Sequence, residues 1–387
     1  MSEVWGGLVG QNEAIETMRQ AAESARTGAG TVGAMTHSWL ITGPPGSGRS
    51  NIAFAFATAL LSDGTPEDEA RTRAMVNART HPDLAVLSTE RVIISIEEVR
   101  GLLSSSQYSP SLARYRVLII EDADRMTERT SNLLLKALEE PPPRTVWILC
   151  APSEADLLPT IRSRVRTVRL RTPEAADVAQ LLMERDGVSA ELALSSAREA
   201  QSHIGMAHRL ATDSDARARR AETLQIVMGL HSVPAAVEAA ARLLAIAGDD
   251  AKAITEQKDA EERASALRSL GVEPGGSVPP ALRSQLKALE EDQKRRATRS
   301  LRDGIDRILV DLLSLYRDIL LTQLQAGLEP VNVTAREAIV AAAAAGDETR
   351  TLAIMDAIAT ARRRIEANVP PALALEAMLV TARTTRS

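Results

Sequence analysis

The residues best suited to chemistry form a glycine-rich loop at positions 43–50. It reads Gly43, Pro44, Pro45, Gly46, Ser47, Gly48, Arg49 and Ser50. Glycine lets a backbone fold closely around phosphate groups, and a helix that begins directly after the loop adds the positive end of its dipole. Ser50 stands where a phosphate-binding loop carries the hydroxyl that ligates Mg²⁺. The pattern predicts a nucleotide phosphate site, or the relic of one.

One residue of the loop departs from this pattern. Arg49 occupies the position at which a phosphate loop carries lysine. Lysine brings a compact charge to the β- and γ-phosphates, whereas arginine is a bulkier planar fork, so the exchange is not conservative. We therefore expect ATP and Mg²⁺ to bind weakly or not at all, and hydrolysis to be poor or absent. A glycine turn that binds nothing is the plain alternative.

Two carboxylates end an apolar run further along the chain. Glu121 and Asp122 follow Ile120, about 70 residues after the loop. Carboxylates at the end of a buried strand hold Mg²⁺ and orient the attacking water in nucleotide hydrolases. A charged turn between a strand and a helix is the alternative, and the glycine loop earlier in the chain counts against it.

A third set consists of two arginines, Arg162 and Arg164, in the segment 157–165. An arginine at a subunit edge can reach the γ-phosphate held by a neighbouring subunit, as an arginine finger does. Two surface arginines without a function are the default alternative.

These residues lie among alternating strand and helix patterns that cover residues 1–170. Candidate strands are 39–41, 84–88, 115–120, 145–150 and 161–170, and candidate helices are 51–61, 96–105 and a segment from about 130. Strands that alternate with helices at this spacing predict an α/β domain whose parallel sheet is covered on both faces. Ser95 and Glu98 predict a capping box at the start of the second helix.

From residue 172 the pattern is helical throughout. We expect a small helical unit at 173–212, a helix pair at 217–246 and three last helices at 335–347, 349–367 and 370–384. A stripe of apolar residues from Ile305 to Leu320 predicts another helix. Residues 248–302 are highly charged, and we interpret them as long exposed helices around a loop, with disorder expected near 271–280.

The composition excludes several classes of protein. The chain has 387 residues, a net charge of −5 and a single cysteine, Cys150. One cysteine allows no internal disulfide and no zinc site of several cysteines, and its apolar neighbours predict a buried strand thiol. No apolar stretch reaches the length of a membrane span, so we expect a cytoplasmic protein without a membrane partner.

Taken together, five segments resemble the AAA+ clamp-loader subunits of bacterial replication. They are residues 8–11, 43–48, 120–124, 132–142 and 160–164, and 132–142 is the most specific of them. The resemblance covers residues 5–212 well and 305–384 loosely. It implies a P-loop nucleotide-binding-like domain at 1–170, a helical lid at 171–215 and an all-α collar at 216–387, with the charged insertion at 248–302. It also implies that Val9, Gly10, Glu121 and Asp122 would accompany the loop at the nucleotide.

The resemblance further implies partners and a role for one arginine. The partners would be homologous clamp-loader subunits and, through the complex, a sliding clamp and primed DNA. Arg164 matches the family's finger arginine and would act in trans on ATP held by an adjacent ATPase subunit. We interpret the arginine-rich residues 294–302 and 362–364 as charge on solvated helix faces, with direct DNA contact as the alternative.

Departures from the family pattern point to a subunit with little or no hydrolysis of its own. Besides Arg49, the order Glu121–Asp122 is reversed, no cysteine of the zinc module stands between 62 and 80, and His208 occupies the second sensor arginine's position. The alternatives are an active ATPase or helicase-type motor of the same fold and a pure assembly scaffold. A small-molecule P-loop kinase is a distant third, because it would not explain the expected lid and collar.

Overall fold

The computed structural model describes residues 3–6, 8–27, 35–89, 93–269 and 283–383. They form two compact units, Met1–Ala211 and Thr212–Ser387, and each is described by itself. The disorder expected near 271–280 lies outside the described residues. No helix in the described part of the chain is long and apolar enough to cross a membrane.

The first unit is built on a parallel sheet of five strands in the order β2-β3-β4-β1-β5. The strands are β1 (Ser38–Thr42), β2 (Leu84–Leu87), β3 (Arg116–Ile120), β4 (Thr145–Ala151) and β5 (Arg166–Arg169). The central strands β1, β3 and β4 are apolar at nearly every position and almost wholly buried, as expected for strands covered on both faces. The predicted α/β fold is confirmed.

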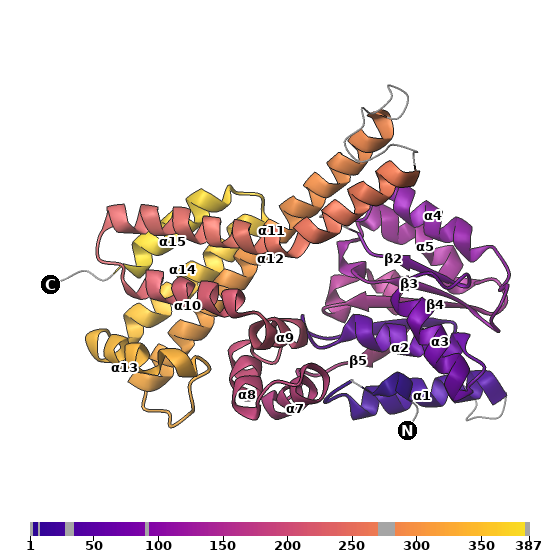
Figure 1. Ribbon diagram of the computed structural model, residues 1–387, viewed down its shortest axis with the longest axis horizontal. Helices are drawn as coiled ribbons and strands as arrows, with labels where there is room; N and C mark the ends of the chain where they lie inside the picture. The colour runs from indigo at the N-terminus through magenta and orange to yellow at the C-terminus, as the bar shows by residue number, and fades with distance from the viewer. Residues whose placement is uncertain (1–2, 7, 28–34, 90–92, 270–282, 384–387) are drawn as a thin grey trace. The chain divides into compact units, whose positions relative to one another are not determined.

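Helices cover both faces of this sheet (Figure 1). One face packs against α1 (Asn12–Thr27), α2 (Arg49–Leu61) and α3 (Pro66–Asn77), and the other against α4 (Ile96–Ser106), α5 (Glu128–Glu139) and the single turn α6 (Pro159–Arg162). Successive strand residues alternate between the faces, so Trp147 packs on the second face and Ile148 on the first. The capping box predicted for α4 is present, with Ser95 and Glu98 bonded reciprocally.

The expected fifth strand is shorter than the sequence suggested. Residues 161–170 contain the end of α6 and the strand β5, because Pro159 starts a helical turn that runs to Arg162. The remaining helices of the first unit are α7 (Ala175–Asp186), α8 (Ala190–Glu199) and α9 (Ile204–Thr212), which pack around a small apolar core of their own. We refer to α7–α9 as the three-helix segment.

The second unit is all-helical. It contains α10 (Ser214–Met228), α11 (Val233–Ser269), α12 (Arg283–Gln323), α13 (Arg336–Ala345), α14 (Glu348–Glu366) and α15 (Pro371–Ala382). The apolar stripe predicted for α12 lies in the hydrophobic core of the second unit, for example at Ile305, Leu312 and Ile319. The helix expected to end near 246 continues to 269, since Gly248 is tolerated inside α11. The described residues of the charged segment therefore belong to the adjoining parts of α11 and α12. The division at residues 170 and 215 stays a prediction.

Candidate functional site

The glycine-rich loop lies between β1 and α2, at the carboxyl edge of the sheet. Gly46 and Gly48 have φ angles of 78° and 91°, a left-handed conformation that disfavours other residues. Helix α2 begins at Arg49 and no side chain caps its first turn. The N–H groups at this end of the helix are therefore oriented as an anion site requires.

Arg49 has a guanidinium group that is partly buried beside this loop. Its Nη1 atom is buried and makes no hydrogen bond within the described part of the chain. A buried donor without a partner is costly unless a ligand satisfies it. Cys150, on the adjacent β4, is fully buried with its Sγ 4.0 Å from the Arg49 carbonyl oxygen. Burial raises the pKa of this thiol to about 12, which confirms the expectation of a structural cysteine.

The acidic strand end also lies at the carboxyl edge, after β3. Glu121 accepts a hydrogen bond from Arg79, with the Nη2 and Oε2 atoms 2.6 Å apart. Asp122 lies 3.6 Å from the Nε of Arg125. Both carboxylates expected to help bind a metal therefore face arginines of the same chain. An arginine placed against a carboxylate competes with Mg²⁺ for its oxygens.

A third carboxylate of this cluster is Asp124. Burial raises the pKa of Asp124, and the nearby charge of Asp122 adds to the increase, while backbone hydrogen bonding and two arginines, Arg125 and Arg49, oppose it. The charges of Arg49 and of the acidic strand end therefore both act on Asp124.

The three-helix segment closes directly on the phosphate loop. The backbone N–H of Ile204 donates to the carbonyl oxygen of Gly46 at 3.2 Å. The ring of His203 packs so closely on Gly46 that a Cβ there would lie 2.2 Å from its Cγ. Only glycine fits at this position, because of both the contact and the φ angle.

Gln11 joins the same elements from the N-terminal side. It is 5% exposed, and its side-chain amide makes two hydrogen bonds to the backbone of Arg171, 2.7 Å to the carbonyl oxygen and 3.1 Å from the N–H. Its Nε2 also lies 3.4 Å from the Ser47 carbonyl oxygen. The preceding Gly10 has φ 69° and lies against Pro173 and Asp177. Val9 packs against the core of the three-helix segment.

Arg164 lies at the opposite edge of the sheet. It precedes β5, whose first residue Arg166 pairs with Trp39 and whose last residue Arg169 pairs with Thr42 at the end of β1. The length of this strand, about 10 Å, separates Arg164 from the phosphate loop. Its Nε donates to Glu139 Oε1 at 2.6 Å, and its Nη1 donates to the Thr160 carbonyl oxygen at 2.7 Å.

The segment after β4 supports the phosphate loop through its backbone, whereas the second sensor position is engaged elsewhere. The carbonyl oxygen of Pro152 accepts the N–H of Gly43 at 3.2 Å, so this position supports the loop by its backbone. His208 Nδ1 lies 2.8 Å from Asp186 Oδ2 within the three-helix segment. Neither contact supplies a side chain to the phosphate loop.

The residues present fit a nucleotide only in part. The open start of α2 and the unpaired Nη1 of Arg49 suit a phosphate group. Ser50 lies in the first turn of that helix, where its hydroxyl could bind Mg²⁺. Glu121 is less suited to bind Mg²⁺, because its carboxylate is already paired with Arg79. The zinc module's loss stays a prediction.

Sequence reasoning missed three residues that shape the site. Arg79 follows α3 with a φ of 57°, and no spacing pattern marks it as a partner of Glu121. His203 precedes α9, where its contact with Gly46 depends on tertiary packing. Glu139 forms an ion pair with Arg164. It lies in segment 132–142, the most specific part of the resemblance, and this position was the sequence's one indication that Glu139 matters.

Several known proteins are similar to the first part of this chain. Residues 11–174 match a family model described as "DNA polymerase III, delta subunit". The chain is 34% identical over 146 residues to DNA polymerase III subunit delta' of Pseudomonas aeruginosa, covering 36% of this chain and 44% of that protein. It is 28% identical over 190 residues to subunit gamma/tau of Mycobacterium tuberculosis, covering 47% of this chain and 31% of that protein.

These matches span less than half the length of either curated relative. A solved gamma subunit-related protein of Thermotoga maritima aligns with 96% of this chain and 98% of its own, at 18% identity and a TM-score of 0.45. The matched segment 11–174 contains the phosphate loop, the acidic strand end and Arg164. This segment is therefore similar to subunits of the DNA polymerase III clamp loader.

Proposed function

We propose that the chain is a clamp-loader subunit of the delta-prime type, which does not hydrolyse ATP itself but supplies Arg164 to ATP held by a neighbouring ATPase subunit. The main support for this proposal is the position of Arg164 at the amino edge of the sheet, opposite the phosphate loop of the same chain. An arginine so placed cannot serve the loop of its own chain. It lies on a surface from which a second subunit's nucleotide can be approached.

The carboxyl edge supports the loss of hydrolysis in cis. Glu121 forms an ion pair with Arg79, Asp122 lies near Arg125, and Arg49 stands in place of the loop lysine. Hydrolysis would need a free carboxylate to hold Mg²⁺ and another to orient water. We propose that ATP binds weakly or not at all. If it binds, residues 43–50 would hold the phosphates, and Val9 and Gly10 would lie near the base.

Arg164 is suited to exchange its present partner for a phosphate. Its guanidinium group is a planar fork with five donors, which matches phosphate oxygens. The side chains of Arg164 and Glu139 are 31% and 46% exposed, so their ion pair is screened and weak. We propose that Glu139 and the Thr160 carbonyl hold the arginine in position until a neighbour's nucleotide replaces the carboxylate.

The proposed partners follow from the family. They are ATPase subunits of the gamma/tau type, a delta-type subunit and, through the assembled loader, a sliding clamp and primed DNA in the cytoplasm. The helical second unit would act as the collar that holds the subunits in a ring. The charged outer parts of α11 and α12 have no role in this proposal.

The test is an Arg164→Ala change in the reconstituted loader. We expect ATP turnover to fall by about tenfold or more, since an arginine finger contributes roughly 10³–10⁵ in rate at its own site. Arg164→Lys should rescue little, because lysine lacks the fork. Arg162→Ala is the matched control, since Arg162 is an exposed neighbour. Assembly is measured by gel filtration, and unchanged turnover in an intact complex would refute the finger role.

A second candidate is an ATPase that works in cis. The observation in its favour is the buried, unpaired Nη1 of Arg49 beside the open start of α2. Steady hydrolysis by the isolated chain would distinguish it from the proposal. A pure scaffold would be favoured if removing this chain left the turnover of the remaining complex unchanged.

A further inference from the structure

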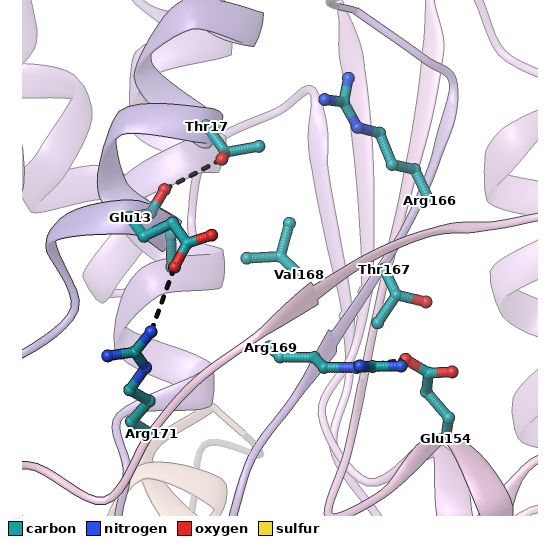
Figure 2. Close-up of a pocket in the computed structure, with 9 residues that line it drawn as sticks. Glu13, Thr17, Glu154, Arg166, Thr167, Val168, Arg169 and Arg171 are labelled. Atoms are coloured by element: carbon teal, nitrogen blue, oxygen red, sulfur yellow. Dashed lines mark hydrogen bonds and ion pairs between the residues drawn. The ribbon is translucent and has the colours of Figure 1, made fainter.

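A groove of about 600 Å³ runs along the free edge of β5. Figure 2 shows its walls: Glu13 and Thr17 of α1 on one side, and β5 with Glu154 on the other. In the sheet order, β5 is an outermost strand, and within the described residues it pairs with β1 alone. Edge strands present unpaired backbone groups that can take up another strand.

The register shows which backbone groups face this groove. The N–H of Leu170 donates to the Thr42 carbonyl oxygen on β1 at 2.7 Å. Backbone groups alternate in direction along a strand, so those of residues 167, 169 and 171 point away from β1 and toward the groove. The neighbouring residues 166 and 168 are the ones paired with β1.

Gln11 already uses one of these outward positions as a strand would. Its side-chain amide accepts from the N–H of Arg171 and donates to the carbonyl oxygen of the same residue. A residue of a neighbouring strand would form the same pair of hydrogen bonds with the Arg171 backbone. The outward N–H and C=O groups of Thr167 and Arg169 have no partner within the described residues. The pairing therefore stops where the groove begins.

The charge around the edge favours one kind of occupant. Residues 162–171 contain five arginines and no acidic residue. Two of them reach into the groove and pair with single glutamates, Arg169 with Glu154 at 2.9 Å and Arg171 with Glu13 at 3.4 Å, as the dashed lines of Figure 2 show. These arginines are 78% and 81% exposed, so the pairs are weak and can be exchanged for other carboxylates.

We infer that the groove accepts an extended, acidic segment of a partner protein as an added strand on β5. The backbone of the segment would pair with Thr167 and Arg169, continuing the contact that Gln11 makes with Arg171. Carboxylates of the segment would face Arg166, Arg169 and Arg171. Main-chain bonds supply affinity in this mode of recognition, and side chains supply specificity. The inference does not depend on the proposed function, because it needs neither nucleotide nor loader subunits.

The test uses the full chain and a fluorescein-labelled peptide in which Glu and Val alternate, with binding measured by fluorescence anisotropy. We expect saturable binding, and no binding by the matched Lys–Val peptide. Thr167→Pro removes only the outward N–H, since this residue does not donate to β1, and edge strands tolerate proline. It should weaken binding about fivefold, the effect of losing one hydrogen bond. Thr167→Val is the control and should bind normally.

A second arm does not depend on a protein variant. The Glu–Val peptide, N-methylated at alternate backbone nitrogens, keeps its charge but loses its strand bonds, and it should bind at least about fivefold more weakly to the unchanged chain. Equal binding of both peptides would mean that charge alone attracts them and would overturn the strand addition. Absence of binding by the parent peptide would also overturn it and leave the arginines as protection of an exposed edge.

Discussion

The two edges of one sheet carry sites in contrasting states. At the carboxyl edge, the phosphate loop and the acidic strand end have the family's layout, but residues of the same chain occupy them: Arg79 holds Glu121, and His203 covers Gly46. At the amino edge, Arg164 is held by a partly exposed glutamate. The two sites share no side chains. Under the proposed function, the chain's own phosphate site can therefore lose its chemistry while Arg164 keeps its role toward a neighbouring subunit.

The largest effect is expected from breaking the junction at Gln11. Gln11→Ala removes both bonds to Arg171 and leaves partly buried polar groups of its backbone unpaired, so we expect the first unit to lose about 1–2 kcal/mol of stability. All three tryptophans, Trp5, Trp39 and Trp147, lie in that unit, so urea unfolding followed by their fluorescence reports on it alone. The matched control is Gln20→Ala on the exposed face of α1. Equal midpoints for the two variants would show that Gln11 is not a structural link.

A smaller effect should follow from uncovering the phosphate loop. His203→Ala removes the ring that packs on Gly46, and we expect the affinity for a fluorescent ATP analogue to rise about threefold, because the closed state loses contact energy relative to an open one. The control is His208→Ala, whose ring pairs with Asp186 instead. An affinity that falls or stays unchanged in His203→Ala would mean that this contact does not restrain the site.

The smallest effect concerns the charge of Asp124. Burial, aided by Asp122, raises its pKa above the ordinary 3.8, so the folded state binds this proton more tightly than the unfolded chain does. The carboxyl therefore lowers stability progressively as pH rises from 3.8 through its folded pKa. Asp124→Asn should gain less than about 1 kcal/mol at neutral pH, because the group is partly solvated.

Urea unfolding at pH 4.5 and 7.5 measures this gain. The advantage of the Asn variant over the parent chain should be greater at pH 7.5. An advantage that is larger at the lower pH would contradict the direction of the pKa shift.

The sequence predicted the sheet because its strands are strongly apolar and bounded by clear turn and capping residues. The family resemblance implied that Glu121 accompanies the loop, and both lie at the carboxyl edge of the parallel sheet. The sequence could not predict the contact of Arg79 with Glu121 or of His203 with Gly46, since both join residues far apart in the chain through tertiary packing. The start of β5 was misplaced because Arg-rich residues 161–165 fit a helical turn and a strand equally well.

The second unit shows the same limit. The spacing of apolar residues revealed the buried stripe of α12. It did not reveal the cluster of buried polar residues in the second unit. Asn332 is fully buried and donates to Asp318 and Ser314, while Arg220 contacts both Asn332 and Asp311. Buried polar groups need such partners, yet their pairing depends on how α10, α12 and the chain after α12 meet. No local pattern contains that information.

The central claim is that this chain does not hydrolyse ATP in its own site. Calorimetric titration of the purified chain with ATP and Mg²⁺, with hydrolysis assayed in the same samples, tests it most directly. The account predicts no binding, or weak binding without turnover. Turnover that disappears on Ser50→Ala would contradict it, because Arg49 would then replace lysine in a working site and the chain would be a motor subunit.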